Sequence, residues 1–307
     1  MNVYIPAVIR PPKEEGGSKM AKKSDVNLRK GGIERAFSFL ELNTREEKPR
    51  ERGVTEIRGP YYTPMGKRYL EDMFETMGAY VDILKFAGGS FSLMPRGAVK
   101  ELIDLCHRFN VRVDTGGFIE HVLTLGNAAV DRYIEECKRL EFDIVEISSG
   151  FLSMPSDDLV RLTEKVQKAG LKAKAEVGIQ FGAGGASTVE ELEAEGTGDV
   201  DWAVMRARKH LDAGAYMIMI ESEGITESVR TWRTDVIVKF IRELGIEKTM
   251  FEAAEPEVFN WYVKNYGPEV NLFIDHSQII LLESLRSGIW GTKNLWGRVR
   301  TYKGRQT

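Results

Sequence analysis

The feature of this sequence that most constrains its fold is a regular alternation, from Gly53 onward, of short apolar runs with amphipathic helical stretches. The apolar runs are rich in β-branched and aromatic residues, which is typical of buried strands. The predicted strands are 54–57, 81–86, 111–114, 144–147, 173–177, 216–221, 249–253 and 271–275. The predicted helices are 67–77, 97–109, 128–140, 156–169, 199–213, 228–244, 256–266 and 277–285. The glycines expected to end helices are Gly78, Gly170, Gly214, Gly245 and Gly267.

Eight such strand–helix units match an α/β protein of the (β/α)8 TIM-barrel type, which takes roughly 250 residues. The strands are apolar along their whole length, as in a parallel sheet that is covered on both faces. A doubly wound open sheet is the alternative. It is not favoured, because the turn Arg58-Gly59-Pro60 follows the first predicted strand where a nucleotide-binding fold would carry its glycine-rich fingerprint.

The two ends of the chain differ from this pattern. Residues 1–48 combine Pro, Gly and charged residues with little periodicity, which predicts a flexible N-terminal extension. We expect the catalytic barrel over 49–291 and a basic C-terminal tail over 292–307. Aromatic residues lie among the arginines after the last predicted helix, a composition that is typical of subunit contacts and predicts a homo-oligomer. A solvated tail is the alternative.

Composition and charge exclude several classes of function. The formal net charge of -3 gives no general basis for binding nucleic acid or an anionic membrane. No uncharged apolar run approaches the roughly 20 residues of a membrane span, and the N-terminus lacks the apolar core of a signal peptide. Cys106 and Cys137 fall in helical patterns, as free thiols do in a reducing compartment, so we expect a cytoplasmic protein. His107 and His210 are expected on helix surfaces.

Polar residues gather at the carboxyl ends of the predicted strands, which is the edge where barrels carry their active sites. The second strand delivers Lys85 into the turn Gly88-Gly89-Ser90, where bare backbone amides and a cation suit an anion. A similar turn, Gly116-Gly117, follows the third strand. The charged and hydroxyl residues at these ends include Glu56, Arg58, Asp114, Glu146, Ser148, Lys174, Glu176, Glu221, Glu223, Glu252 and Asp275.

A single carboxylate at a strand end is more often a helix cap or the partner of a surface lysine than a catalytic group. Gathered acids differ, because like charges at one barrel mouth raise each other's pKa unless cations join them. Oxygen ligands without nearby cysteines or paired histidines favour Mg²⁺ over zinc. The sequence therefore predicts a Mg²⁺ site beside Lys85 and Arg58. The glycine turns can equally serve packing, and the loop 178–198 is either a lid or an insertion.

Several short motifs, in order, carry a resemblance to a known family. They are Leu84-Lys85-Phe86-Ala87-Gly88-Gly89-Ser90, Thr115-Gly116-Gly117, Val145-Glu146-Ile147-Ser148, Ala175-Glu176-Val177-Gly178, Met250-Phe251-Glu252-Ala253 and Leu282-Glu283-Ser284-Leu285-Arg286-Ser287-Gly288. Over about residues 52–291 the chain resembles the phosphosulfolactate synthase family. The resemblance implies a (β/α)8 barrel that adds sulfite to phosphoenolpyruvate with Mg²⁺. The implied product is (2R)-phospho-3-sulfolactate, in the first step of coenzyme M biosynthesis.

The chain departs from the family's archaeal members at two places. Those members carry lysines directly after the Glu-Val-Gly turn, where this chain has Ile179 and Gln180. They also carry an arginine soon after the glutamate of the sixth strand, where this chain has Ser222-Glu223-Gly224. Both departures remove positive charge from a site for two anions. Arg230 or Arg233 can restore one charge, and Lys174 can replace the proton donor.

The resemblance and the strand-end residues together give a set of expected roles. The expected Mg²⁺ ligands are Glu146, Glu176 and Glu221. The expected catalytic residues are Lys85 or Lys174 as the acid that protonates the second carbon of the substrate, and Glu252. The expected substrate-binding residues are Arg58, Gly88, Gly89, Ser90, Gly116, Gly117, Ser148 and Arg233.

Two other functions stay open. The two departures favour a related Mg²⁺-dependent barrel enzyme that acts on another enol phosphate or uses another nucleophile. The segments 245–253 and 275–279 look closer to the plant heat-stress-associated proteins, a related branch, which allows a non-catalytic interaction protein. The presence of the strand-end acids argues against a non-catalytic interaction protein, because a scaffold does not need several carboxylates that repel one another at one site.

Overall fold

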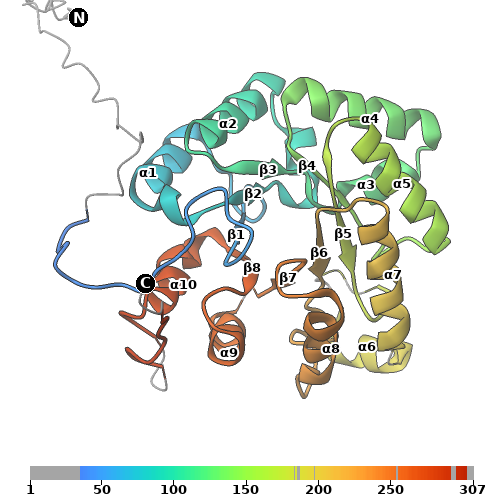
Figure 1. Ribbon diagram of the computed structural model, residues 1–307. Coiled ribbons are helices and arrows are strands. Elements are labelled where there is room, and N and C mark those ends of the chain that lie inside the picture. Colours follow the sequence, from blue (N-terminus) through green and yellow to red (C-terminus); the bar gives the residue numbers. More distant parts are fainter. Residues whose placement is uncertain are drawn as a thin grey trace, which may run out of the picture. The chain divides into compact units, whose positions relative to one another are not determined.

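The computed structural model describes residues 35–182, 184, 187–196, 198–253, 255–291 and 295–302. The chain divides into two compact units, one that ends at Leu40 and one that begins at Glu41. In the first unit the Arg35 guanidinium donates a hydrogen bond to the Leu40 carbonyl. The second unit contains all the strands and helices described below (Figure 1).

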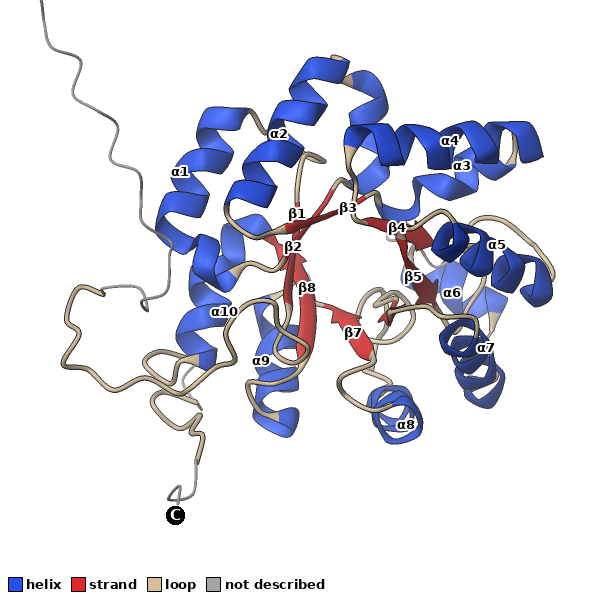
Figure 2. Cartoon of the chain, turned by 45° about the horizontal axis from the view of Figure 1, so that its top comes forward, coloured by secondary structure: helices blue, strands red, loops and turns tan. Residues whose placement is uncertain are grey.

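Eight parallel strands close into a barrel in sequence order, as Figure 2 shows. They are β1 (Thr55–Arg58), β2 (Ile83–Lys85), β3 (Arg112–Asp114), β4 (Ile144–Ile147), β5 (Lys172–Val177), β6 (Met217–Ile220), β7 (Thr249–Glu252) and β8 (Asn271–Asp275). The last strand pairs with the first, Arg58 opposite Asp275, so no strand edge is left open. The predicted (β/α)8 barrel is confirmed.

The helices surround the barrel (Figure 2). They are α1 (Lys67–Met77), α2 (Arg96–Arg108), α3 (Ile119–Leu123), α4 (Asn127–Leu140), α5 (Ser156–Lys168), α6 (Val189–Glu195), α7 (Val200–Asp212), α8 (Thr234–Leu244), α9 (Pro256–Tyr266) and α10 (Ile279–Arg286). Short 3-10 turns include η1 (Gly78–Tyr80), η2 (Ala87–Leu93), η3 (Gly116–Phe118) and η4 (His276–Gln278). Gly78 ends α1, as expected; its φ is -59°, and it also opens η1.

The alternation of side chains along each strand separates the core from the site. In β1, Ile57 packs into the main apolar core with the helices, whereas Glu56 and Arg58 point into the barrel. A second apolar cluster fills the barrel interior with inward residues such as Ile83, Met219 and Phe273. The polar residues therefore stand above an apolar floor, at the carboxyl ends of the strands.

The segment before β1 is fastened at the amino ends of the strands. The Asn43 side chain donates hydrogen bonds to the Arg286 and Val299 carbonyls at 2.9 and 2.8 Å. Arg50 pairs with Asp82 at 3.0 Å. Of the extension expected over 1–48, residues 41–48 thus belong to the barrel unit, and residues 1–34 lie outside the described residues.

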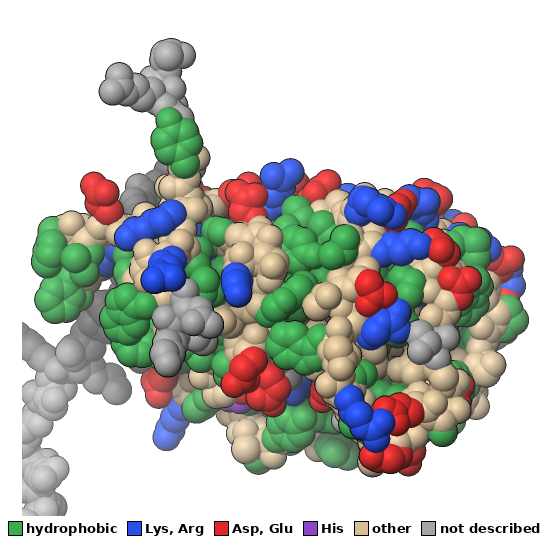
Figure 3. Space-filling model, turned by 90° about the horizontal axis from the view of Figure 1, so that it is seen from below, with side chains coloured by type: hydrophobic (Ala, Val, Ile, Leu, Met, Phe, Trp, Pro, Cys, Tyr) green, Lys and Arg blue, Asp and Glu red, His purple; other side chains and the backbone are tan. Residues whose placement is uncertain are grey.

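The C-terminal segment also packs on the barrel where it is described. Leu295 and Val299 are buried, whereas Trp290 and Trp296 are exposed, with ring centroids 4.2 Å apart. Residues 292–294 and 303–307 of the expected basic tail lie outside the described residues. Among the described residues on the face in Figure 3, acidic and basic side chains are interspersed, without a large patch of one sign.

Two further expectations about single residues can be compared with the fold. Cys106 and Cys137 are free and buried, as expected. His210 is buried in α7, 4% exposed, and its Nδ1 lies 2.8 Å from the Thr163 hydroxyl, so its expected surface position is wrong. No helix within the described residues is both long and apolar enough to cross a membrane.

Candidate active site

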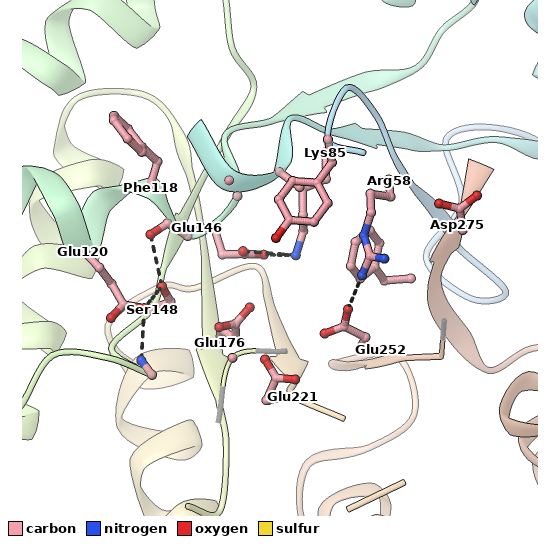
Figure 4. A pocket seen from close by; sticks show the side chains of 18 of the residues that line it. Arg58, Lys85, Phe118, Glu120, Glu146, Ser148, Glu176, Glu221, Glu252 and Asp275 are labelled. Atoms are coloured by element: carbon pink, nitrogen blue, oxygen red, sulfur yellow. Dashed lines mark hydrogen bonds and ion pairs between the residues drawn. The ribbon is translucent and has the colours of Figure 1, made fainter. Parts of the chain in front are cut away.

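The carboxyl ends of the strands surround a cavity of about 650 Å³ (Figure 4). Among the described residues that line the cavity, only Arg58 and Lys85 are arginine or lysine. The described lining also contains eight carboxyl groups, namely Glu120, Glu146, Glu176, Glu221, Glu227, Glu252, Glu255 and Asp275. The cavity is therefore strongly acidic, and an anion binds there only if cations or protons offset this charge.

Lys174 lies deeper, at the centre of a group that we call the Lys174 cluster: Lys174, Glu56, Asp114 and Glu146. Its Nζ is 2.7 Å from Glu56, 2.6 Å from Asp114 and 2.9 Å from Glu146. The Lys174 side chain is 0% exposed and does not line the cavity. Burial opposes its charged form, but the three carboxylates overcome that penalty and hold the pKa of Lys174 well above its usual range.

The carboxylates of this cluster respond to the same ammonium. Burial alone would raise the pKa of Glu146, but Lys174 and Lys85 lower it to about 2. Burial raises the pKa of Asp114 to about 7 against the pull of Lys174. The Asp114 carboxylate also accepts the Gly116 backbone N–H at 2.8 Å, which ties the cluster to the turn after β3.

Lys85 connects the Lys174 cluster to the cavity. Its Nζ lies 2.8 Å from the Glu146 carboxylate and 4.1 Å from the centroid of the Phe273 ring. Burial opposes the charged form of Lys85, but Glu146 overcomes it and raises the pKa above the usual value. Lys85 is therefore a protonated amine at the cavity wall. Figure 4 shows its nitrogen paired with the Glu146 carboxylate.

The opposite wall holds three glutamates that we call the cavity acids: Glu176, Glu221 and Glu252 (Figure 4). Burial, followed by Glu146 and Glu221, raises the pKa of Glu176 well above its usual range. Burial, followed by Glu252, does the same to the pKa of Glu221. Among the described residues, no lysine or arginine lies within ion-pair distance of Glu176 or Glu221, whereas Arg58 lies 2.7 Å from Glu252.

The first pair of glycines expected to hold an anion, Gly88 and Gly89, lies against aromatic rings. A Cβ on Gly88 would stand 2.5 Å from the Tyr61 ring, and one on Gly89 would overlap the Phe118 ring. Both glycines have positive φ, so they supply a turn and a seat for an aromatic ring. Gly88 lines the cavity, but Gly89 and Ser90 do not contribute to the described lining. The Ser90 hydroxyl is buried without a hydrogen-bond partner among the described residues.

The second glycine turn does reach the cavity. Gly116 and Gly117 line it, and a Cβ on Gly117 would stand 2.6 Å from the Ser148 hydroxyl oxygen. Ser148 donates a hydrogen bond to Glu120 at 2.6 Å (Figure 4). Glu120 also accepts the backbone N–H groups of Gly150 and Phe151 at 3.0 and 2.8 Å. Glu120 thus fixes the loop after β4.

Sequence reasoning missed Glu120, Tyr61 and Tyr62 among the lining residues. Glu120 lies on α3, a short helix without enough periodicity for a prediction. Tyr61 and Tyr62 follow Pro60 in an irregular loop, where only the neighbouring Arg58 gives a signal. The guanidinium of Arg58 lies 5.7 and 5.5 Å from their ring centroids.

Arg233 is not brought to the cavity. Its guanidinium pairs with Asp235 at 2.8 Å, and it lines a separate pocket of about 340 Å³ with Gln180 and Leu192. Arg230 lines the same pocket and pairs with Glu190 at 3.5 Å. Neither arginine therefore restores the positive charge that the chain lacks after β5 and β6.

Comparison with known proteins identifies the family of this chain. The family model described as (2R)-phospho-3-sulfolactate synthase (ComA) matches residues 43–292. The chain belongs to the phosphosulfolactate synthase family. The resemblance predicted from the strand-end motifs is confirmed.

Named members of the family match most of the chain. Protein HEAT-STRESS-ASSOCIATED 32 of Arabidopsis thaliana is 42% identical over 81% of this chain and 91% of its own length. The phosphosulfolactate synthase of Methanothermobacter thermautotrophicus is 29% identical over 83% of this chain and 96% of its own length. That of Bacillus subtilis is 25% identical over 81% of this chain and 95% of its own length.

The Mg²⁺ expected for a phosphosulfolactate synthase can be compared with the carboxylates present. Among the described residues, Glu56, Asp114 and Glu146 form the one group whose oxygens lie within 4.8 Å of one another, close enough to hold a metal ion. The expected ligands Glu146, Glu176 and Glu221 all line the cavity but do not form such a group. Lys174 already supplies a positive charge to the closer group.

Glu176 and Glu221 fit a hard divalent cation better. Their oxygen donors suit Mg²⁺, and they face the cavity without a lysine or arginine partner among the described residues. Their raised pKa values come from burial and from neighbouring carboxylates, chiefly Glu146 for Glu176 and Glu252 for Glu221, and a bound cation relieves that repulsion.

Proposed function

We propose that this protein is a Mg²⁺-dependent lyase that adds a sulfur nucleophile to phosphoenolpyruvate, as a phosphosulfolactate synthase does with sulfite. The observation that carries the proposal is the opposition of Lys85 and the cavity acids. A protonated amine faces Glu176 and Glu221, which have no lysine or arginine partner among the described residues, across a cavity that has room for small molecules.

The chain's own residues divide the work. Arg58 and Lys85 bind and orient the phosphate and carboxylate of the substrate, helped by the Gly88 and Gly116-Gly117 turns. Addition at the methylene carbon makes the neighbouring carbon basic, and Lys85 gives it a proton from one face. Lys174 cannot take this role in the arrangement described, because it is enclosed by three carboxylates below the cavity. Glu252 accepts a proton beside Arg58.

Glu176 and Glu221 would hold the metal ion. When bound, the ion draws negative charge onto the substrate carboxylate. Glu146 then has another role than the ligand expected from the sequence: it holds Lys85 in place and keeps it protonated. With sulfite as nucleophile the product is (2R)-phospho-3-sulfolactate, and the reaction serves coenzyme M biosynthesis.

Incubation of the purified protein with phosphoenolpyruvate, sulfite and Mg²⁺ tests the proposal. We expect a sulfonate product by mass spectrometry, and loss of turnover in Lys85→Met. Lys172→Met is the matched control. Lys172 is an exposed lysine at the amino end of β5, whereas the cavity lies at the carboxyl ends of the strands. An active Lys85→Met enzyme would remove Lys85 from the mechanism.

A second candidate function is a non-catalytic interaction protein. It is favoured by the 42% identity to Protein HEAT-STRESS-ASSOCIATED 32, whose name assigns no reaction. Folded protein that binds Mg²⁺ but consumes no phosphoenolpyruvate with any nucleophile would support this candidate.

We also propose a cytoplasmic homo-oligomer. The exposed pair of Trp290 and Trp296 supports a subunit contact. Light scattering on the wild type and on Trp290→Ala tests it, since a contact through this pair predicts a smaller particle for the variant.

A further inference from the structure

The outer part of the cavity is aromatic. Tyr61, Tyr62, Phe118 and Phe151 line it, and we call these residues the aromatic wall. Tyr61, Tyr62 and Phe151 are 50%, 74% and 60% exposed. Large exposed rings beside a polar cavity leave apolar surface for something else to cover.

Three of the four rings rest on glycines. Tyr61 lies on Gly88, Phe118 on Gly89, and Phe151 on Gly184. A Cβ at any of these glycines would approach the ring to 2.5 Å or closer, which non-bonded carbon atoms do not do. The backbone is therefore shaped to hold rings at these places, and the wall is part of the built site.

Hydrogen bonds fasten the loops that carry the wall. Glu120 accepts the Phe151 backbone N–H at 2.8 Å, and the Gly182 N–H donates to the Gly150 carbonyl at 2.7 Å. Glu223 accepts the Gly184 N–H at 2.6 Å. These bonds join the loops after β4, β5 and β6, so the position of Phe151 is fixed from both sides.

The charges of the cavity bear on the second substrate. Lys85 and Arg58 are each paired with a glutamate, Glu146 and Glu252. Among the described residues, no other lysine or arginine lines the cavity. One anionic substrate and a divalent cation can balance the cavity acids. A second substrate that is a small inorganic dianion would find no further lysine or arginine among the described lining residues to balance its charge. A nucleophile that enters uncharged needs no such partner.

We propose that the nucleophile of this enzyme is an organic thiol whose apolar or aromatic body lies against the aromatic wall. The inference rests on the proposed function and names the substrate class of the same site. Aromatic contacts of this kind contribute about 0.5–1.5 kcal/mol each beyond the area they bury. These contacts favour a nucleophile that carries an apolar or aromatic group, which sulfite lacks.

The chemical step is an addition without oxidation or reduction. The thiol sulfur forms a bond to the methylene carbon of phosphoenolpyruvate, and the electron pair of the double bond moves to the carbon that bears the phosphate. That carbon takes a proton from Lys85. The thiol proton passes to Glu252, so one R–S group and one hydrogen are added and nothing leaves.

The test compares three nucleophiles with phosphoenolpyruvate and Mg²⁺: sulfite, 2-mercaptoethanol and phenylmethanethiol. We expect kcat/KM for phenylmethanethiol to exceed that for 2-mercaptoethanol about tenfold, the ratio that 1.4 kcal/mol of added contact gives. Tyr62→Ala and Phe151→Ala should each raise KM for phenylmethanethiol about fivefold, a larger change than either makes in KM for phosphoenolpyruvate. Tyr302→Ala, which removes an exposed ring outside the cavity, should change neither value.

Turnover of sulfite without turnover of either thiol would overturn this inference and leave the proposed function standing. Equal kcat/KM for the two thiols would also overturn it. If phosphoenolpyruvate is not consumed with any nucleophile, the proposed function fails, and binding decides the inference. Saturation-transfer NMR should then show phenylmethanethiol bound to the wild type and bound about fivefold more weakly to both wall variants, and absence of transfer in the wild type would contradict the aromatic subsite.

Discussion

The Lys174 cluster and the cavity acids are two groups of carboxyl side chains inside the barrel that meet on β5, yet they differ in how their charge is balanced. Lys174 and Glu176 lie two residues apart on one face of β5. The deeper residue is enclosed by Glu56, Asp114 and Glu146 within 2.9 Å. The upper one faces the cavity without a cation partner among the described residues.

This difference separates a structural role from a functional one. A lysine that pairs with three buried carboxyl groups stabilises the barrel interior and cannot readily release its proton. Carboxylates that repel one another beside a cavity destabilise the empty site, and they regain that free energy when a cation binds. Lys85 belongs to both systems, because Glu146 holds it while its amine reaches the cavity.

The largest effect is expected from Lys174→Met. The substitution leaves three buried carboxylates without their ammonium, which should lower the free energy of unfolding by about 3–5 kcal/mol. Urea unfolding followed by circular dichroism measures it. Lys172→Met should change stability by less than about 0.5 kcal/mol, as surface substitutions do. A Lys174→Met protein as stable as the wild type would show that the cluster is not held by this ammonium.

Substitution of the cavity acids should have the opposite sign. In metal-free protein, Glu176→Gln and Glu221→Gln each remove one buried carboxylate that repels its neighbours, so stability should rise, by about 1 kcal/mol. Mg²⁺ affinity measured by calorimetry should fall about tenfold or more, since a lost ligand is expected to remove at least 1.4 kcal/mol. Unchanged affinity in both variants would place the metal elsewhere.

A further prediction uses a buried group outside both systems. Burial lowers the pKa of His210 to about 4 in the folded protein, against an ordinary value of 6.5. The unfolded chain therefore binds more protons between these values, and stability that is complete above pH 6.5 falls as the pH drops toward 4. The loss should reach about 1–2 kcal/mol at pH 5.

His210→Asn is the matched variant, because an amide can keep the contact with the Thr163 hydroxyl without titrating. Urea unfolding at pH 7 and pH 5 should show a smaller loss of stability in the variant than in the wild type. The same loss in both proteins would assign the pH dependence to other groups.

The smallest effect is expected from Arg233→Ala. Its guanidinium pairs with Asp235 and lies in a separate pocket, so KM for phosphoenolpyruvate should change less than about twofold. Steady-state kinetics measure this. A much larger rise in KM would bring Arg233 back as a substrate ligand, as the sequence suggested.

The fold was predictable because the period of the apolar residues changes between strands and helices along the whole barrel. The predictions for β4, β8, α1 and α9 match the structure residue for residue. Strand β2 is shorter than the predicted 81–86, because the sequence pattern does not show where pairing with β3 ends. Helix α8 begins at Thr234 and not at 228, since an irregular segment precedes it.

The site was predictable only as a list of strand-end residues. Their positions at the carboxyl ends of the predicted strands brought Lys85, Glu146, Lys174 and Glu176 to the barrel mouth, but these positions could not give the depth of each side chain. Lys174 lies deeper in the barrel and is enclosed, whereas Lys85 lies higher and reaches the cavity. For the glycine turns the sequence leaves an anion cradle and a packing role both open, because it cannot show that the rings of Tyr61 and Phe118 lie on Gly88 and Gly89.

The most direct test of the two charge systems is anomalous diffraction from crystals soaked in Mn²⁺, which has the same preference for oxygen ligands as Mg²⁺. We predict an anomalous peak at the cavity, with Glu176 and Glu221 among its ligands, and no peak among Glu56, Asp114 and Glu146. A peak within the Lys174 cluster, with the Lys174 side chain displaced, would contradict the account.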